Sequence, residues 1–301
     1  MELWVAVSIA AALFQTVRFM LQKYLSQVSL SAAGATFARF LYSAPVALAL
    51  LALYPVQGGA QLGVRGAEFW AYGATGGLAQ IVATVLTVML FKRRNFAVGV
   101  TFIKVEVLLT ALIGLVVLGD TVSVLGLGAI LVGVAGVLVL SGPAAGAAAG
   151  GWARLLSPSA GLGLAAGALF GVSAVCYRGA SLQVAGEDPF LRALVTLAAV
   201  TTMQTLAMVL WLRLREAGEI RRVAAAWRSA MWIGVTSMAG SFCWFTGFTL
   251  QNAAYVKAVG QVELIFAVLG SVLFFKESIS GREWLGMGLL SCSILALVLV
   301  S

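Results

Sequence analysis

Two glutamates lie in the middle of long apolar stretches of the sequence. Glu106 and Glu263 each follow about ten residues of their stretch, which at about 1.5 Å per helical residue places them about 15 Å deep in a bilayer. A carboxylate at that depth costs a few kcal/mol, so it usually faces a polar cavity or a charged partner. We expect these two residues either to couple protons or bind substrate, or to form ion pairs that hold helices together.

Lys104 is a third charged residue at a similar depth. It lies two positions from Glu106, so the two side chains leave a helix in different directions and do not automatically pair. Lys104 could bind an anionic group of a substrate, or it could form a salt bridge with Glu263. The sequence leaves both alternatives open.

Aromatic and basic residues of other apolar stretches are further candidates. Trp244 and Tyr255 lie close in sequence to Glu263, so we expect them in the wall of a binding pocket, with ordinary packing as the alternative. Cations nearer the ends of the stretches are expected to extend to the membrane surface. These cations are Arg18, Arg39, Arg178 and Lys257. The secondary candidates for the site are Arg39, Lys257, Tyr42 and Tyr72.

The balance of charges and the missing residue types limit the chemistry. Counted with Lys104, the apolar stretches hold five cations against two anions, which favours a substrate with a carboxylate, phosphate or sulfonate. The sequence has no histidine, and its three cysteines have no paired spacing, so neither a metal site nor a cofactor is expected. We expect no enzymatic activity; an intramembrane lipid-modifying enzyme is the alternative, but it needs a residue cluster that this sequence lacks.

The composition predicts a polytopic membrane protein. Hydrophobic residues make up 61% of the 301 residues and charged residues only 10%, whereas soluble domains have about 25% charged residues. Soluble, disordered and nucleic-acid-binding proteins are excluded, and the net charge of +8 is assigned to loops at the anionic membrane face. Ten transmembrane helices are expected, at about residues 3–22, 32–54, 68–91, 96–118, 121–141, 159–179, 189–212, 229–250, 254–275 and 283–300.

The two halves of the sequence are similar to each other. A Gly/Ala-rich linker is expected at residues 142–158, between a first half at 1–141 and a second at 159–301. Residues 95–123 align with 252–280 without gaps, with six of 29 positions identical, and Glu106 then meets Glu263. Five helices per half give the copies opposite orientations, an arrangement typical of transporters. We therefore predict an all-α integral membrane fold of ten transmembrane helices, arranged as two inverted five-helix repeats.

Several other residues are expected to have structural roles. Asp120 and Glu277 lie at equivalent helix ends, each followed by Thr or Ser, so we expect them to cap the next helices. Glycines with four-residue spacing predict faces on which two helices approach closely. These glycines are Gly73 and Gly77 in one helix, and Gly163, Gly167 and Gly171 in another.

The stretch from Gln251 to Gly286 resembles the drug/metabolite transporter superfamily, in its ten-helix EamA-like branch. The resemblance rests on Asn-Ala-Ala-Tyr at 252–255, Val-Glu at 262–263, Phe-Lys-Glu-Ser-Ile-Ser at 275–280 and Trp-Leu-Gly at 284–286, and Gly-Asp-Thr at 119–121 echoes it. Family members usually have Glu-Pro in mid-helix, where this chain has Glu106-Val107 and Glu263-Leu264. The resemblance implies a carrier of metabolites such as amino acids, nucleotide sugars, organic phosphates or drug-like cations.

These features together predict a secondary active transporter that exports a small metabolite by alternating access, with a midplane site between the repeats. An amino acid, a related zwitterion or an organic anion is the favoured substrate, and proton-driven efflux of drug-like cations is the alternative. Its partners are then the small-molecule substrate and membrane lipid, with no nucleic acid, and the internal duplication allows a monomer. We expect the bacterial inner membrane, and the loop charges place both termini outside, opposite to the usual orientation of the family.

Overall fold

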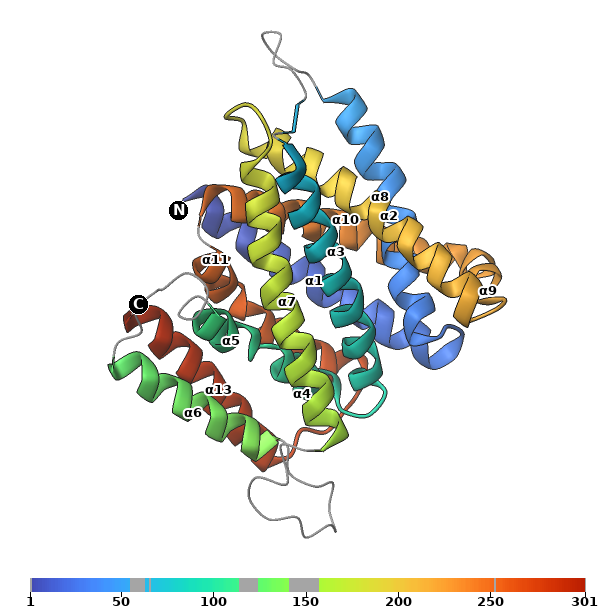
Figure 1. Ribbon diagram of the computed structural model, residues 1–301. Coiled ribbons are helices and arrows are strands. Elements are labelled where there is room, and N and C mark those ends of the chain that lie inside the picture. Colours follow the sequence, from blue (N-terminus) through green and yellow to red (C-terminus); the bar gives the residue numbers. More distant parts are fainter. Residues whose placement is uncertain are drawn as a thin grey trace.

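The computed structural model describes residues 2–54, 63–64, 66–113, 124–140, 157–251 and 253–300 (Figure 1). Apart from one isolated β-bridge between Val64 and Val184, the regular structure of these residues is helical. Asp120, Asn252 and most of the predicted linker lie outside the described residues. The first half contains α1 (Leu3–Val28), α2 (Ala32–Leu53), α3 (Gly66–Phe91), α4 (Phe96–Ile103), α5 (Glu106–Ile113) and α6 (Val124–Leu140). The second half contains α7 (Pro158–Leu182), α8 (Pro189–Arg215), α9 (Glu219–Ala225), α10 (Trp227–Leu250), α11 (Ala253–Val259), α12 (Glu263–Leu269) and α13 (Gly281–Val300).

The long helices have the length and hydropathy of membrane spans. Within the described ranges, six helical segments are long and apolar enough to cross a membrane: α1, α2, α3, α7, α8 and the segment Tyr255–Phe274. The prediction of an all-helical membrane protein is therefore confirmed. The finer prediction, ten spans in two inverted repeats, stays a prediction.

Local sequence signals begin several of these helices. Ser31 and Ser157 accept hydrogen bonds from the backbone N–H groups three residues later, and so cap α2 and α7. Asp188 accepts from the N–H of Phe190 at 2.9 Å and caps α8. Helices α7 and α8 each have proline at their first position, where the missing N–H costs nothing and the fixed φ suits the helix.

Helices of the first half pack against helices of the second half in a reciprocal pattern. Helix α1 contacts α10 and α3 contacts α7, while α2 contacts α8 and α6 contacts α13. Figure 1 shows α6 and α13 side by side at one edge of the molecule. Glycine permits the last contact, because a Cβ at Gly136 would lie 2.8 Å from the backbone N of Leu290.

Two helices are interrupted directly before a glutamate. Between α4 and α5, the N–H groups of Lys104, Val105 and Val107 bond to carbonyls three residues earlier instead of four. Between α11 and α12, residues Gly260–Val262 form a 3-10 turn. Neither interruption contains a proline, and a tightened backbone is present at both breaks instead.

Helix α7 lies against the first interruption. A Cβ on Gly163 would lie 2.6 Å from the Phe102 side chain, and a Cβ on Gly167 would lie 2.9 Å from the backbone O of Ile103. On α3, Gly73 and Gly77 face α8 less closely, because a Cβ there would lie 3.1 Å from Met203 and 3.4 Å from Gln204, both at side-chain atoms. The close approach predicted from the four-residue spacing is confirmed at Gly163 and Gly167.

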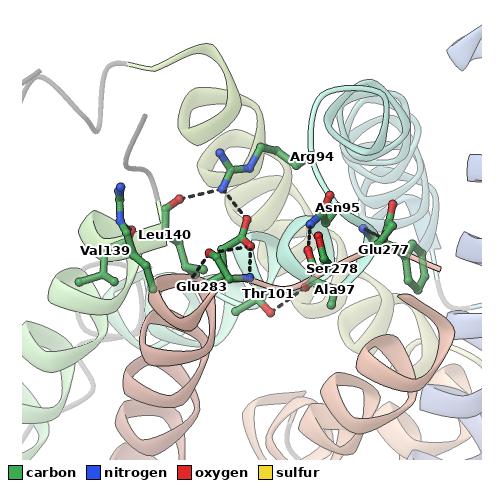
Figure 2. Close-up of polar contacts among 12 residues, drawn as sticks. Arg94, Asn95, Ala97, Thr101, Val139, Leu140, Glu277, Ser278 and Glu283 are labelled. Carbon is green, nitrogen blue, oxygen red and sulfur yellow. Dashed lines mark hydrogen bonds and ion pairs between the residues drawn. The ribbon is translucent and has the colours of Figure 1, made fainter. Parts of the chain in front are cut away.

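Polar contacts hold the ends of α4 and α13 together (Figure 2). Glu277 accepts from the backbone N–H of Phe96 at 2.7 Å, pairs with Lys23 and accepts from Ser271. Its expected role as the cap of the next helix is therefore wrong, because its carboxylate caps α4 of the other half. The start of α13 is capped instead by Ser280 and Glu283, whose side chains each accept from the backbone N–H of the other.

Replacing Ser280 with alanine removes one side of this capping box. We expect Ser280→Ala to lower the free energy of unfolding by about 1 kcal/mol, because an N–H of the first turn of α13 loses its acceptor. Thermal unfolding of the detergent-solubilised protein measures the change. Ser278→Ala is the matched control, since its exposed side chain lies two residues earlier; an equal effect in both variants would contradict the capping role.

Candidate functional site

Four charged residues form two buried ion pairs between the halves of the chain. Lys104 pairs with Glu263, and Lys257 pairs with Glu106, with 3.3 Å between Lys257 Nζ and Glu106 Oε1. None of the four is more than 7% exposed. Each pair joins a lysine of one half to a glutamate of the other, so we call them the crossed ion pairs.

The interrupted helices position both glutamates. Glu106 is the first residue of α5, and Glu263 is the first residue of α12. The N-terminal end of a helix carries a partial positive charge, of about half a unit in a long helix, which stabilises a carboxylate there. The breaks thus place each carboxylate at a helix start and beside a lysine of the other half.

Gln15 of α1 and Trp244 of α10 connect the crossed ion pairs to each other. Gln15 donates to Glu263 Oε2 at 2.8 Å and accepts from the indole N–H of Trp244 at 3.0 Å. Lys257 Nζ lies 4.5 Å from the centroid of the Trp244 ring, within range of a cation–π interaction. The other carboxylate oxygen of Glu263, Oε1, has no hydrogen-bond partner among the described residues. It can therefore take up a proton or accept a hydrogen bond from an ammonium group.

A small cavity adjoins these residues. Its volume is about 20 Å³, close to the minimum that holds one water molecule. Its polar lining consists of Gln15, Gln80, Ser173, Tyr177, Ser241 and Lys257, and its aromatic lining of Phe170, Trp244, Phe245 and Phe248. Pockets for small molecules usually have about 300–1,000 Å³, so a metabolite can bind here only when the surrounding helices move apart.

Two arginines lie in the same interior, where extension to the membrane surface was expected. Arg18 is 2% exposed and Arg39 is 3% exposed. Arg39 donates to the hydroxyls of Ser237, Thr84 and Ser241 at 2.9, 3.1 and 3.3 Å. The expectation of surface extension is wrong for both, because these hydroxyls hold Arg39 and the packing of α1 against α10 encloses Arg18. It is also wrong for Lys257, which is 7% exposed and pairs with Glu106.

The second half of the chain matches the model of a known family. Residues 158–299 match the EamA-like transporter family. These residues belong to the EamA-like transporter family. The resemblance predicted from residues 251–286 is confirmed, and membership of this family suggests a membrane transporter of small molecules.

Solved structures support the fold of the whole chain. Solved structures match it, among them a crystal structure with 16% sequence identity and a TM-score of 0.64. That match covers 98% of this chain and 96% of the other, so the fold extends over both halves. No curated protein matches the chain.

The remaining predicted site residues lie apart from the crossed ion pairs. Tyr255 is 39% exposed, on the outer side of α11, and Tyr72 is 40% exposed beside Gly179 of α7. Tyr42 donates to the backbone O of Val223 in α9, at 3.3 Å. The structure therefore brings together Lys104, Glu106, Lys257, Glu263 and Trp244, and it leaves these three tyrosines outside.

Sequence reasoning missed neutral polar residues that complete the site. Gln80 of α3 accepts at Oε1 from the Tyr177 hydroxyl and from Gln204 Nε2, both at 3.0 Å, in a chain of hydrogen bonds beside the cavity. Gln15 was missed in the same way. Amides in apolar stretches were the available signal, because an amide in mid-membrane also needs partners.

A groove of about 350 Å³ lies between α12 and α13, but its lining is mostly apolar and includes the exposed Ile265, Leu269 and Trp284. It suits an acyl chain better than a polar metabolite. Across the described ranges, no group of three or more Cys, Asp or Glu side chains is placed to hold a metal ion.

Proposed function

We propose that this EamA-like chain is a secondary active transporter that exports a small metabolite by alternating access, with its substrate bound between the two halves at the crossed ion pairs. The observation that carries the proposal is that both interrupted helices present a buried carboxylate to a lysine of the opposite half. Carriers of several folds bind substrate at such helix breaks near the membrane midplane.

The crossed ion pairs suggest how binding is linked to movement. They bridge the halves, so separating the halves at this level leaves four buried charges without partners, which is costly. A substrate ammonium group at Glu263 Oε1, or a proton on a carboxylate, replaces part of the lost interaction. Glu263 is the leading candidate for this role, Glu106 is its counterpart, and the two lysines are the groups released.

The reciprocal packing of the helices supports the predicted repeat. If each of the first five predicted spans is exchanged for its counterpart in the second five, the contact between α1 and α10 becomes the contact between α7 and α3. The contacts between α2 and α8 and between α6 and α13 each map onto themselves. A two-fold arrangement of this kind is what inverted repeats produce. The loop charges support a topology with both termini outside, in a bacterial inner membrane.

The favoured substrate is an amino acid, a related zwitterion or an organic anion, because the interior contains both carboxylates and an excess of cations. Proton-driven efflux of drug-like cations is the second candidate. The unpartnered Oε1 of Glu263 is the observation that favours it, since an acceptor without a donor suits a cationic amine.

Counterflow in proteoliposomes tests the proposal. Vesicles are loaded with unlabelled amino acids, organic phosphates or organic amines, and uptake of the same labelled compound is followed against protein-free vesicles. We expect transient accumulation above equilibrium for one class, with saturation, because a carrier exchanges bound solute across its central site. Conductive flux without saturation would indicate a channel. Folded protein that gives no counterflow with any class would contradict the proposal.

A further inference from the structure

Arg39 is a buried cation whose hydrogen-bond partners carry no charge. Its guanidinium donates to the side chains of Ser237, Thr84 and Ser241, which are hydroxyls of α10 and α3. Hydroxyls orient a guanidinium group but do not neutralise it. Arginine keeps its proton in proteins, so the charge cannot be removed by deprotonation.

Arg18 of α1 is a second buried cation, and it has fewer polar partners than Arg39. Its Nη1 has no hydrogen-bond partner among the described residues, although the residue is only 2% exposed. Its guanidinium carbon lies 4.4 Å from the centroid of the neighbouring Phe19 ring, which offers a weak cation–π contact and no counter-charge. Its electrostatic neighbours are Arg39, which repels it, and Glu263, which attracts it but already pairs with Lys104.

The carboxylates of this interior are already engaged elsewhere. Glu263 pairs with Lys104, and Glu106 pairs with Lys257. Four buried cations thus face two buried carboxylates in this part of the described chain, so the two arginines amount to two positive charges in excess. Uncompensated charges inside a membrane protein are costly and are usually retained for a function.

We infer that Arg18 and Arg39 form a binding site for the anionic group of the transported molecule, a carboxylate, phosphate or sulfonate. The planar guanidinium fork matches two oxygens of such groups. The inference rests on the proposed transport function and specifies its substrate: the molecule carries an oxyanion, and these arginines bind it, not Lys104.

The site is continuous with the cavity beside the crossed ion pairs. Ser241 both lines that cavity and accepts from Arg39. Arg18 lies three residues after Gln15 on α1, hence on the same helix face, and Gln15 also lines the cavity. Once the surrounding helices have moved apart and enlarged this cavity, an oxyanion on the arginines would place the rest of the molecule beside Gln15 and Ser241, with an amine directed toward Glu263.

Anion binding to the detergent-solubilised full-length protein tests the inference without requiring transport. Thermal unfolding is followed in sodium phosphate and in sodium glutamate, against sodium chloride at equal ionic strength. We expect at least one oxyanion to raise the unfolding temperature of the unmodified protein in a saturable manner, because a ligand that binds only the folded state stabilises it. The apparent dissociation constant should weaken at least tenfold in Arg18→Gln and in Arg39→Gln.

Arg221→Gln is the matched control, because Arg221 is an exposed arginine of α9; its anion response should equal that of the unmodified protein. Arg39→Lys keeps the charge without the fork and provides a second variant if Arg39→Gln does not fold. Arg18→Gln should leave the unfolding temperature without anion unchanged or higher, since it removes an unpaired buried charge.

Two results would overturn the inference: no stabilisation by either oxyanion, or equal stabilisation in the Gln variants and the unmodified protein. A shift produced only by vesicles or micelles of phosphatidylglycerol would also overturn it, since the ligand would then be a lipid headgroup. Loss of counterflow with intact anion binding would contradict the transport function instead. Counterflow of neutral or cationic compounds alone would contradict this inference and leave the transport function in place.

Discussion

Glu263→Gln should destabilise the protein by about 3–5 kcal/mol and abolish counterflow. The double variant Lys104→Gln with Glu263→Gln should recover most of the lost stability, but it should not recover counterflow. The single change leaves the ammonium group of Lys104 buried at 2% exposure without its carboxylate. The double change removes both charges, and glutamine side chains can still bond to each other. Thermal unfolding in detergent measures stability, and proteoliposome counterflow measures function.

Glu187→Gln controls for the loss of a carboxylate, because Glu187 is exposed in the loop before α8. Additive losses of stability in the double variant would mean that the two side chains are not energetically coupled in the folded protein. Counterflow at the unmodified rate in a stable double variant would show that the pair only clamps the halves together. The central-carboxylate mechanism would then be wrong.

Gly167→Val should produce the second large effect, a loss of about 3 kcal/mol or more together with loss of transport. A Cβ at this position would lie 2.9 Å from the backbone O of Ile103 and 3.1 Å from the backbone N of Glu106. Backbone atoms cannot rotate away as a flexible side chain can. Helix α7 would have to move from the interruption that positions Glu106, and the yield of folded protein and its unfolding temperature would report this.

Gly161→Val is the internal control for this substitution. Gly161 lies on the same helix, and a Cβ there meets nothing within 4 Å. Both variants share the cost of replacing glycine with a β-branched residue in a helix, so their difference isolates the close approach. Equal stability of the two variants would contradict the requirement for glycine at 167.

The charged centre of the site could be predicted because buried charge is conspicuous in an apolar sequence. Glu106, Glu263 and Lys104 were identified from depth alone, and the salt bridge of Lys104 with Glu263 was one of the two alternatives considered. The partner of Glu106 could not be found in this way, since Lys257 lies 151 residues away and nearer a helix end. Only the packing of the halves brings the two together.

The positions of the arginines and tyrosines required the three-dimensional structure. Distance from a helix end predicts depth along the membrane normal, but it does not tell whether a side chain faces lipid or the protein interior. Arg18 and Arg39 were therefore expected to extend to the membrane surface, with Arg39 also a secondary site candidate, although α1 and α2 turn both inward. Tyr255 shows the opposite difference: it was expected in a pocket wall because it is close in sequence to Glu263, but its side chain is exposed on α11.

The crossed ion pairs also bear on the order in which the protein is made. The carboxylate partner of Lys104 is synthesised 159 residues after it, and the lysine partner of Glu106 is synthesised 151 residues after it. The first half therefore enters the membrane before either native partner exists, and its interrupted helix cannot reach its final electrostatic state. The crossed ion pairs can therefore form only after α11 and α12 have left the ribosome.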